Sequence, residues 1–109
     1  MRLSFKEQEG IKNAIGACLQ EIPFKLYLFG SRADDKKKGG DIDLLLLVPA
    51  SEKETVVELK NKIRIKIFET LSEQRIDITV AIEQECASDE FLRSILRGAI
   101  PLSGRGSFK

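Results

Sequence analysis

The sequence contains no histidine and only two cysteines, Cys18 and Cys86, which are far apart along the chain. The usual zinc sites and a catalytic pair of serine or cysteine with histidine are therefore excluded. The longest uninterrupted apolar run, Leu44 to Val48, is far too short to cross a bilayer, and the N-terminal stretch lacks the apolar core of a secretory signal. These absences predict a reduced, cytoplasmic protein in which any bound metal has oxygen ligands, as magnesium or manganese does.

The sequence also lacks an excess of charge of either sign. The 18 lysines and arginines nearly balance the 17 acidic residues, which leaves a net charge of +1. No overall field would attract nucleic acid or an anionic membrane, so any contact with a polyanion must be local. With 109 residues, 42% of them hydrophobic, the chain fits a single domain over residues 1–109, and we expect a frayed tail from about Ser103.

Hydrophobic periodicity predicts helices that alternate with short strands. An S-x-x-E capping box at Ser4 and a second one at Ser51 indicate two helix starts. The predicted helices cover residues 5–20, 51–71 and 88–98, and the predicted strands cover 25–29, 41–48, 75–82 and, at a sheet edge, 99–102. This order predicts a small α/β (α+β) domain with a mixed sheet of three to four strands and helices packed on it.

The predicted helix that ends near residue 71 has two different faces. Its apolar stripe is typical of core packing and consists of Val56, Leu59, Ile63, Ile67 and Leu71. The opposite face carries Lys60, Lys62, Arg64 and Lys66. A solvated face is the simpler interpretation of these cations, and contact with a partner is the alternative.

Two acids stand at the start of the most apolar strand. Alternate residues of a strand share a face, so Asp41 and Asp43 point the same way, and their mutual repulsion favours a bound cation. A third acid, Asp77, lies within the apolar segment "RIDITVAI" and would reach the same place if the two strands are neighbours. Three such acids can hold two divalent metals for phosphoryl-type transfer. The simpler alternatives are a turn that ends in Asp41 and Asp43, and a solvated edge-strand acid at Asp77.

The turn before these acids suits an anion. Gly30 follows a predicted strand and permits close approach of the backbone to a ligand, and Ser31 adds a hydroxyl donor. Arg32 could neutralise phosphate charge, although it could equally be a surface residue. The run Lys36–Lys38 is more simply interpreted as a solvated loop. The pattern as a whole predicts acids that hold metal beside a turn that holds a triphosphate.

The segment "FGSRADDKKKGGDIDLLLLV", with "RIDITVAI" downstream, resembles the nucleotidyltransferase superfamily typified by DNA polymerase beta and kanamycin nucleotidyltransferase. The shared features are Gly-Ser after an aromatic strand, a spacer of nine residues here, Asp-x-Asp, and a later strand acid. The small size is most similar to the minimal nucleotidyltransferases, which are often encoded beside a helical HEPN-domain protein. The resemblance covers nearly the whole chain and implies the nucleotidyltransferase fold.

The resemblance also implies roles for individual residues. Asp41, Asp43 and Asp77 would bind Mg²⁺ or Mn²⁺ and form the catalytic set, and the residues that contact the nucleotide would be Gly30, Ser31 and Arg32. The implied reaction transfers a nucleoside monophosphate, AMP from ATP, to an acceptor hydroxyl and releases pyrophosphate. In this sequence Gly40 stands where the minimal proteins often have serine before Asp-x-Asp, and their spacer often has one residue more.

The small size of the chain, compared with larger relatives, implies that it acts with a partner. Larger relatives add a domain that binds the base and the acceptor, so here a partner protein or a second copy is expected to supply that part. The resemblance implies a HEPN-domain protein in a toxin–antitoxin pair, with a hydroxyl on that protein as the acceptor. The alternatives are an antitoxin-type binding module that neutralises its partner by contact with weak or no catalysis, and a nucleotide-binding regulator that never turns over. The charge balance gives no support to nucleic acid as acceptor.

Overall fold

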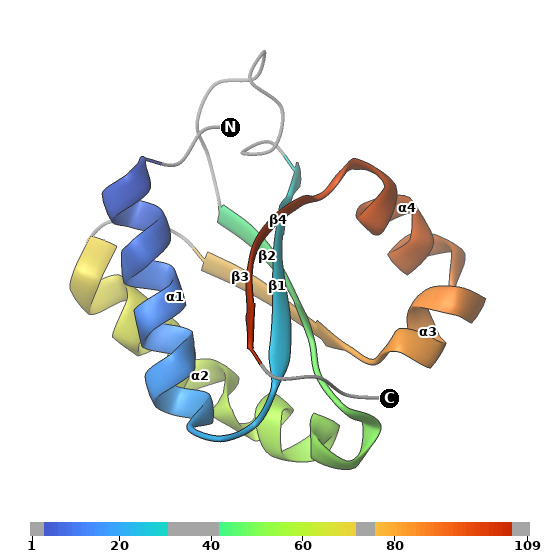
Figure 1. Ribbon diagram of the computed structural model, residues 1–109, viewed down its shortest axis with the longest axis horizontal. Coiled ribbons are helices and arrows are strands. Elements are labelled where there is room, and N and C mark those ends of the chain that lie inside the picture. The colour runs from blue at the N-terminus through green and yellow to red at the C-terminus, as the bar shows by residue number, and fades with distance from the viewer. Residues whose placement is uncertain (1–3, 31–41, 72–75, 106–109) are drawn as a thin grey trace.

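The computed structural model describes residues 4–30, 42–71 and 76–105, and the side chains of this set as far as residue 102. Within these ranges the chain forms four strands, four α-helices and a short 3₁₀ turn, η2 (Figure 1). In chain order the elements are α1 (Phe5–Leu19), β1 (Phe24–Phe29), β2 (Ile42–Leu47), η2 (Ala50–Glu52), α2 (Lys53–Leu71), β3 (Ile76–Ala81), α3 (Glu83–Ser88), α4 (Glu90–Gly98) and β4 (Ile100–Arg105). The predicted α+β class is confirmed.

The four strands form one mixed sheet in the order β3-β2-β1-β4. β2 is antiparallel to β1 and parallel to β3, and β1 is antiparallel to β4. The parallel connection from β2 to β3 passes through α2, as parallel strands require a crossover of this kind. β2 is therefore a central strand, which explains its almost wholly buried sequence. β3 and β4 are the two edge strands.

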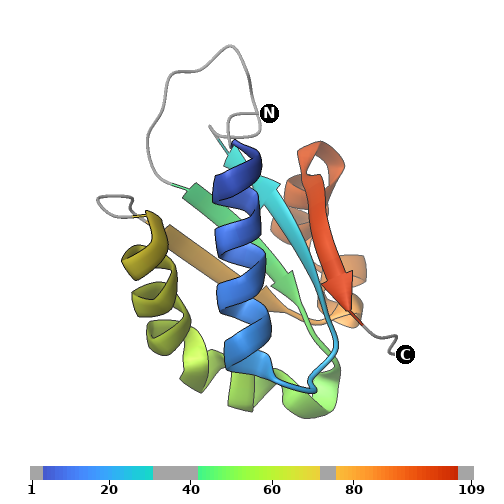
Figure 2. The same ribbon diagram turned by 60° about the vertical axis from the view of Figure 1, so that its left-hand side comes forward.

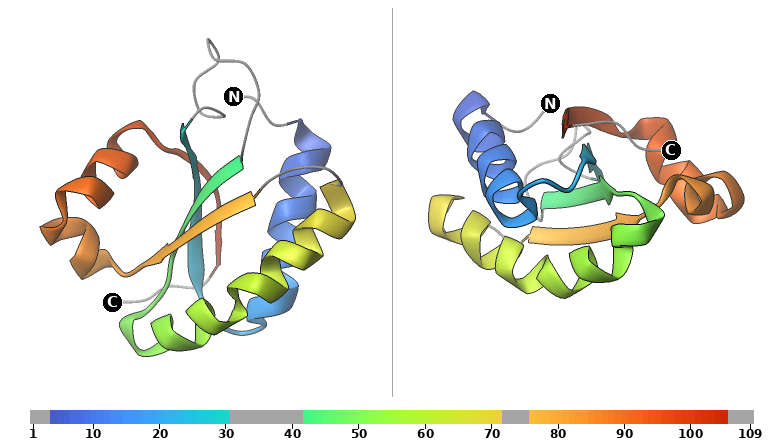
Figure 3. Two further views of the ribbon diagram at one scale, coloured as in Figure 1. Left: turned by 180° about the vertical axis from the view of Figure 1, so that it is seen from behind. Right: turned by 60° about the horizontal axis from the view of Figure 1, so that its bottom comes forward.

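Helices cover both faces of the sheet (Figure 3). On the first face α1 and α2 pack over alternate residues of β2, namely Ile42, Leu44 and Leu46. On the second face α3 and α4 pack over Leu45 and Leu47. The alternation of strand side chains thus divides the apolar residues into two cores. No helix in the described ranges is long and apolar enough to cross a membrane.

Most predicted elements are confirmed with small changes at their ends. Ser4 caps α1 as predicted, with its hydroxyl accepting from the Glu7 amide at 3.1 Å. The capping box at Ser51 is wrong, because Ser51 lies inside η2 and α2 begins at Lys53. The Glu52 amide donates to the carbonyl of Pro49 at 2.9 Å, so the chain tightens into a 3₁₀ turn before the helix starts.

The C-terminal part differs more from the prediction. The helix expected over residues 88–98 is present as α4, but a short helix that was not predicted, α3, precedes it, and the extended residue Asp89 separates the two. Its carboxylate accepts from the Leu92 amide at 3.1 Å and caps α4. β4 continues past Ser103 to Arg105 and pairs with β1, and the expected fraying of the tail stays a prediction. Pro101 stands beside an irregularity in this pairing, where a missing amide hydrogen is tolerated.

Gly10 marks a close approach between α1 and α2. A Cβ atom added there would lie 2.6 Å from Cγ2 of Thr70, whose hydroxyl donates to the Lys66 carbonyl at 3.3 Å. We expect Gly10→Ala to lower the free energy of unfolding by about 1–3 kcal/mol, although alanine favours a helix by up to about 1 kcal/mol. Thr70→Ser removes that methyl group, so Gly10→Ala with Thr70→Ser should recover most of the loss in urea unfolding. Equal stability of Gly10→Ala and the wild type would contradict this packing.

Candidate active site

One row of residues crosses three strands on the second face of the sheet. Phe29 pairs with Asp43 across the antiparallel β1–β2 ladder, and Asp43 pairs with Asp77 across the parallel β2–β3 ladder. By strand alternation Asp43 and Asp77 share the face of Leu45 and Ala81, which belong to the second core. We call Phe29, Asp43 and Asp77 the acid row. It lies where β1 ends and where β2 and β3 begin.

Gly30 places its backbone against the acid row. It has φ +77°, a left-handed conformation in which residues with a side chain are strained. A Cβ atom added at Gly30 would overlap Oδ2 of Asp43 and lie 3.1 Å from its Cγ. Glycine is therefore required here for two reasons, the backbone conformation and the space that the Asp43 carboxylate occupies. The sequence had suggested only close approach of Gly30 to a ligand, so the contact with Asp43 was missed.

The two carboxylates of the acid row suit a hard cation. Neighbouring strands lie about 4.8 Å apart, so residues paired in register have Cα atoms roughly 5 Å apart. Asp43 is half-buried and Asp77 is exposed. Two carboxylates held this close repel each other and favour a cation between them, and oxygen ligands are those that magnesium and manganese prefer. The residues present thus fit a divalent metal, with solvent access from the side of Asp77.

The exposure of Asp77 contradicts one expectation from the sequence. Asp77 was expected to be costly because of its apolar neighbours, but β3 is an edge strand and Asp77 faces solvent. Its position is therefore compatible with a solvated acid as well as with a ligand. The feature that sets Asp77 apart is its register with Asp43 and not its burial.

The remaining predicted site residues lie outside the described residues. These are Ser31, Arg32 and Asp41, together with the lysine run 36–38. Within the described ranges no group of three acidic, histidine or cysteine side chains is placed to hold a metal. The predicted set is therefore represented in the structure by Gly30, Asp43 and Asp77.

The helices α3 and α4 cover the second face beyond the acid row. They pack on Leu45, Leu47 and Ala81, the residues that follow the acids along β2 and β3, and Phe29 adjoins the same core. The acid row thus lies at the edge of the area that α3 and α4 cover. The short helix α3 was not predicted, although its acids Glu83 and Glu85 are the usual signal of a first helical turn.

An ion pair joins α3 to the start of α2. The Lys53 ammonium donates to Glu85 at 2.7 Å, and another oxygen of Glu85 accepts from the Ile82 amide at 3.0 Å. These bonds, the one with Lys53 above all, hold the pKa of Glu85 below its usual value. Glu85 therefore stays ionised near neutral pH and anchors the first turn of α3 beside the sheet.

The cysteines have no catalytic environment. Cys86 is buried in the second core, and burial, followed by the charge of Glu85, raises the pKa of its thiol. A raised pKa disfavours the thiolate that a nucleophile requires. Cys18 is partly buried against the first core.

The comparisons with known proteins agree with this arrangement. No curated protein sequence matches the chain significantly. The family model described as "Nucleotidyltransferase domain" matches residues 11–101, which include β1, the acid row and α4. This match covers most of the 109 residues. The chain therefore belongs to the nucleotidyltransferase domain family, a family of transferases.

Proposed function

We propose that this protein transfers a nucleoside monophosphate, AMP from ATP, to a hydroxyl group of a partner protein in a reaction that depends on Mg²⁺ or Mn²⁺. The observation that carries the proposal is the acid row, in which Asp43 and Asp77 stand in register beside the backbone of Gly30. Membership of the nucleotidyltransferase domain family supports the reaction class. Asp41, Asp43 and Asp77 are the proposed metal ligands.

The residues of the proposed site have different roles. Gly30 keeps the space in front of the Asp43 carboxylate clear of side-chain atoms, because its own Cβ would fill that space. Asp43 is held by a central strand whose neighbouring side chains are fully buried, so its direction is fixed before substrate arrives. Gly30, Ser31 and Arg32 are proposed to bind the β- and γ-phosphates through amide, hydroxyl and guanidinium donors.

The reaction forms one bond and breaks one. The acceptor oxygen attacks the α-phosphorus, the bond from that phosphorus to the bridging oxygen of the β-phosphate breaks, and pyrophosphate leaves. The acceptor proton passes to solvent or to a carboxylate of the acid row. A divalent cation bound at these carboxylates would supply a lower pKa for the acceptor hydroxyl and neutralise charge on the leaving group.

A second candidate function is a binding module, an antitoxin-type protein that neutralises a helical HEPN-domain partner by contact. The observation that favours it is the set of large apolar side chains exposed on α2, namely Val57, Ile65 and Phe68. The two functions make different demands on the acid row. Catalysis requires its charges, whereas neutralisation by contact does not.

The test compares ATP labelled at the α-phosphate with ATP labelled at the γ-phosphate. The protein is incubated with Mg²⁺, either ATP and the product of the adjacent gene, and magnesium-dependent ATP binding is measured by calorimetry. Transfer of the α-label with release of pyrophosphate is expected. Transfer of the γ-label, or no magnesium-dependent ATP binding, would contradict the proposal. If Asp43→Asn abolishes labelling but leaves neutralisation of the partner intact, neutralisation acts by contact.

A further inference from the structure

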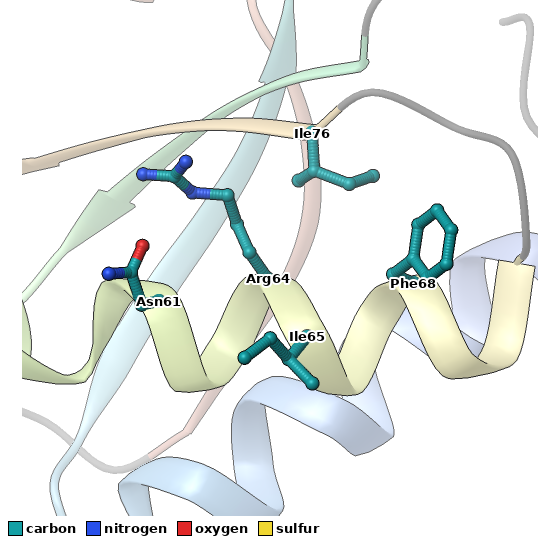
Figure 4. Close-up of a pocket in the computed structure, with 5 residues that line it drawn as sticks. All are labelled: Asn61, Arg64, Ile65, Phe68 and Ile76. Carbon is teal, nitrogen blue, oxygen red and sulfur yellow. The ribbon is translucent and has the colours of Figure 1, made fainter.

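A groove runs between α2 and the first residue of β3, on the face of the sheet opposite to the acid row. Its lining residues are Asn61, Arg64, Ile65, Phe68 and Ile76, and its volume is about 360 Å³ (Figure 4). Four of the five come from successive turns of α2, and Ile76 faces them from β3. β3 is an edge strand, and α2 lies beside it (Figure 2). The groove therefore lies at this edge of the sheet.

The outer face of α2 beside the groove is unusually apolar for an exposed surface. Ile65 is 61% exposed, Phe68 54% and Val57, about two turns before Ile65 and about three before Phe68, 44%. Single exposed apolar residues are ordinary, but three large ones on one helix flank beside a groove mark an interaction surface. From Val57 to Phe68 the helix rises about 16 Å, which corresponds to about three turns. This length suits the apolar face of a second helix.

The charges along this flank indicate the chemistry of that helix. Arg64 projects into the groove, and none of the described residues that line it is acidic; the acids Glu54 and Glu58 lie beside Val57, at the other end of the flank. Within the described residues no ion pair is formed by Arg64 or by the other cations of α2 from residue 60 onward, Lys60, Lys62 and Lys66. A helix that offers apolar side chains together with a carboxylate would cover Ile65 and Phe68 and pair with Arg64.

A second copy of the chain fits less well. In a twofold dimer centred on the groove, each copy presents the same patch to the other, so the two Arg64 guanidinium groups would meet. Nucleic acid is also disfavoured, because three of the five described lining residues, Ile65, Phe68 and Ile76, are apolar and one of the five is a cation. We propose that the α2–β3 groove binds an amphipathic, acidic helix of a partner protein. The proposal is independent of nucleotidyl transfer, because the acid row lies on the other face.

The test is a selection of binding peptides from a display library of random peptides against the intact protein. We expect enrichment of sequences with apolar residues at helical spacing and with aspartate or glutamate between them. Arg64→Glu should weaken these peptides at least about tenfold, as should Phe68→Ser. A second selection against Arg64→Glu should replace the acidic residues of the peptides by lysine or arginine.

Two control variants match the substitutions in type but lie outside the groove. Lys62→Glu makes a similar charge change on another side of the same helix, and Phe91→Ser removes an exposed phenylalanine of α4. Neither should weaken the peptides more than about twofold. Circular dichroism checks that every variant is folded.

The proposal would be overturned if the selection enriched no peptides, or only peptides without acidic residues. Self-association of the chain that Phe68→Ser abolishes would overturn it by assigning the groove to a second copy. Oligonucleotide binding that Arg64→Glu abolishes would overturn it by assigning the groove to nucleic acid. Equal weakening by Lys62→Glu and Arg64→Glu would show unspecific charge attraction and also contradict it.

Discussion

Asp43→Asn is expected to reduce nucleotidyl transfer at least about 100-fold and to remove the effect of magnesium on the protein. Asparagine has nearly the same shape as aspartate but no charge, so the change tests the carboxylate and not the packing. In the wild type, magnesium should raise the melting temperature, because the cation relieves the repulsion between Asp43 and Asp77. The measurements are label transfer from α-labelled ATP and thermal unfolding with and without magnesium.

Asp77→Asn decides between the two interpretations of the edge-strand acid. As a metal ligand in register with Asp43, it should reduce both transfer and the magnesium effect on melting. As a solvated acid of an edge strand, it should change neither. Glu90→Gln is the matched control, since Glu90 is 92% exposed on α4 and its neutralisation should leave transfer unchanged. Full activity of Asp43→Asn would contradict the proposed site.

Gly30→Ala is expected to abolish transfer and also to destabilise the fold. A residue with a side chain at φ +77° costs about 1–2 kcal/mol in backbone strain, and the new methyl group would displace the Asp43 carboxylate. Transfer should fall at least about 100-fold, as for loss of the carboxylate itself. The measurements are label transfer, magnesium-dependent melting and urea unfolding.

Two further variants separate the two causes. Gly30→Asn tolerates the left-handed conformation better than alanine but still carries a Cβ, so it should be more stable than Gly30→Ala and equally inactive. Gly98→Ala is the control, because a Cβ at Gly98, the last residue of α4, meets nothing within 4 Å. That variant should keep full activity. Near wild-type transfer by Gly30→Ala would show that the position of Asp43 is unimportant.

Several parts of the fold were predictable because they depend on neighbours in the sequence. The stripe of α2 buries Val56, Ile63 and Ile67 as its helical spacing predicted. The paired Ser4 and Glu7 cap α1, since a capping box needs only the first helical turn. α3 was not predicted, because a helix of six residues is too short for a clear periodicity and depends on packing against the sheet.

The sequence by itself determined which residues of each strand share a face. Asp43 therefore lies with Leu45 and Leu47, and Asp77 with Ala81, because the two-residue period of a strand is a local property. The sequence also contains the acid pair and the Gly-Ser segment before it. It therefore indicates the membership of the nucleotidyltransferase domain family.

Only the tertiary structure decided how these pieces meet. It set Asp77 in register with Asp43, brought Gly30 against the Asp43 carboxylate and left β3 at an edge, where Asp77 and the flank of α2 face solvent. The register of a sheet joins segments that are far apart in the chain. It therefore depends on how α2 and the two cores pack, which no local pattern of residues contains.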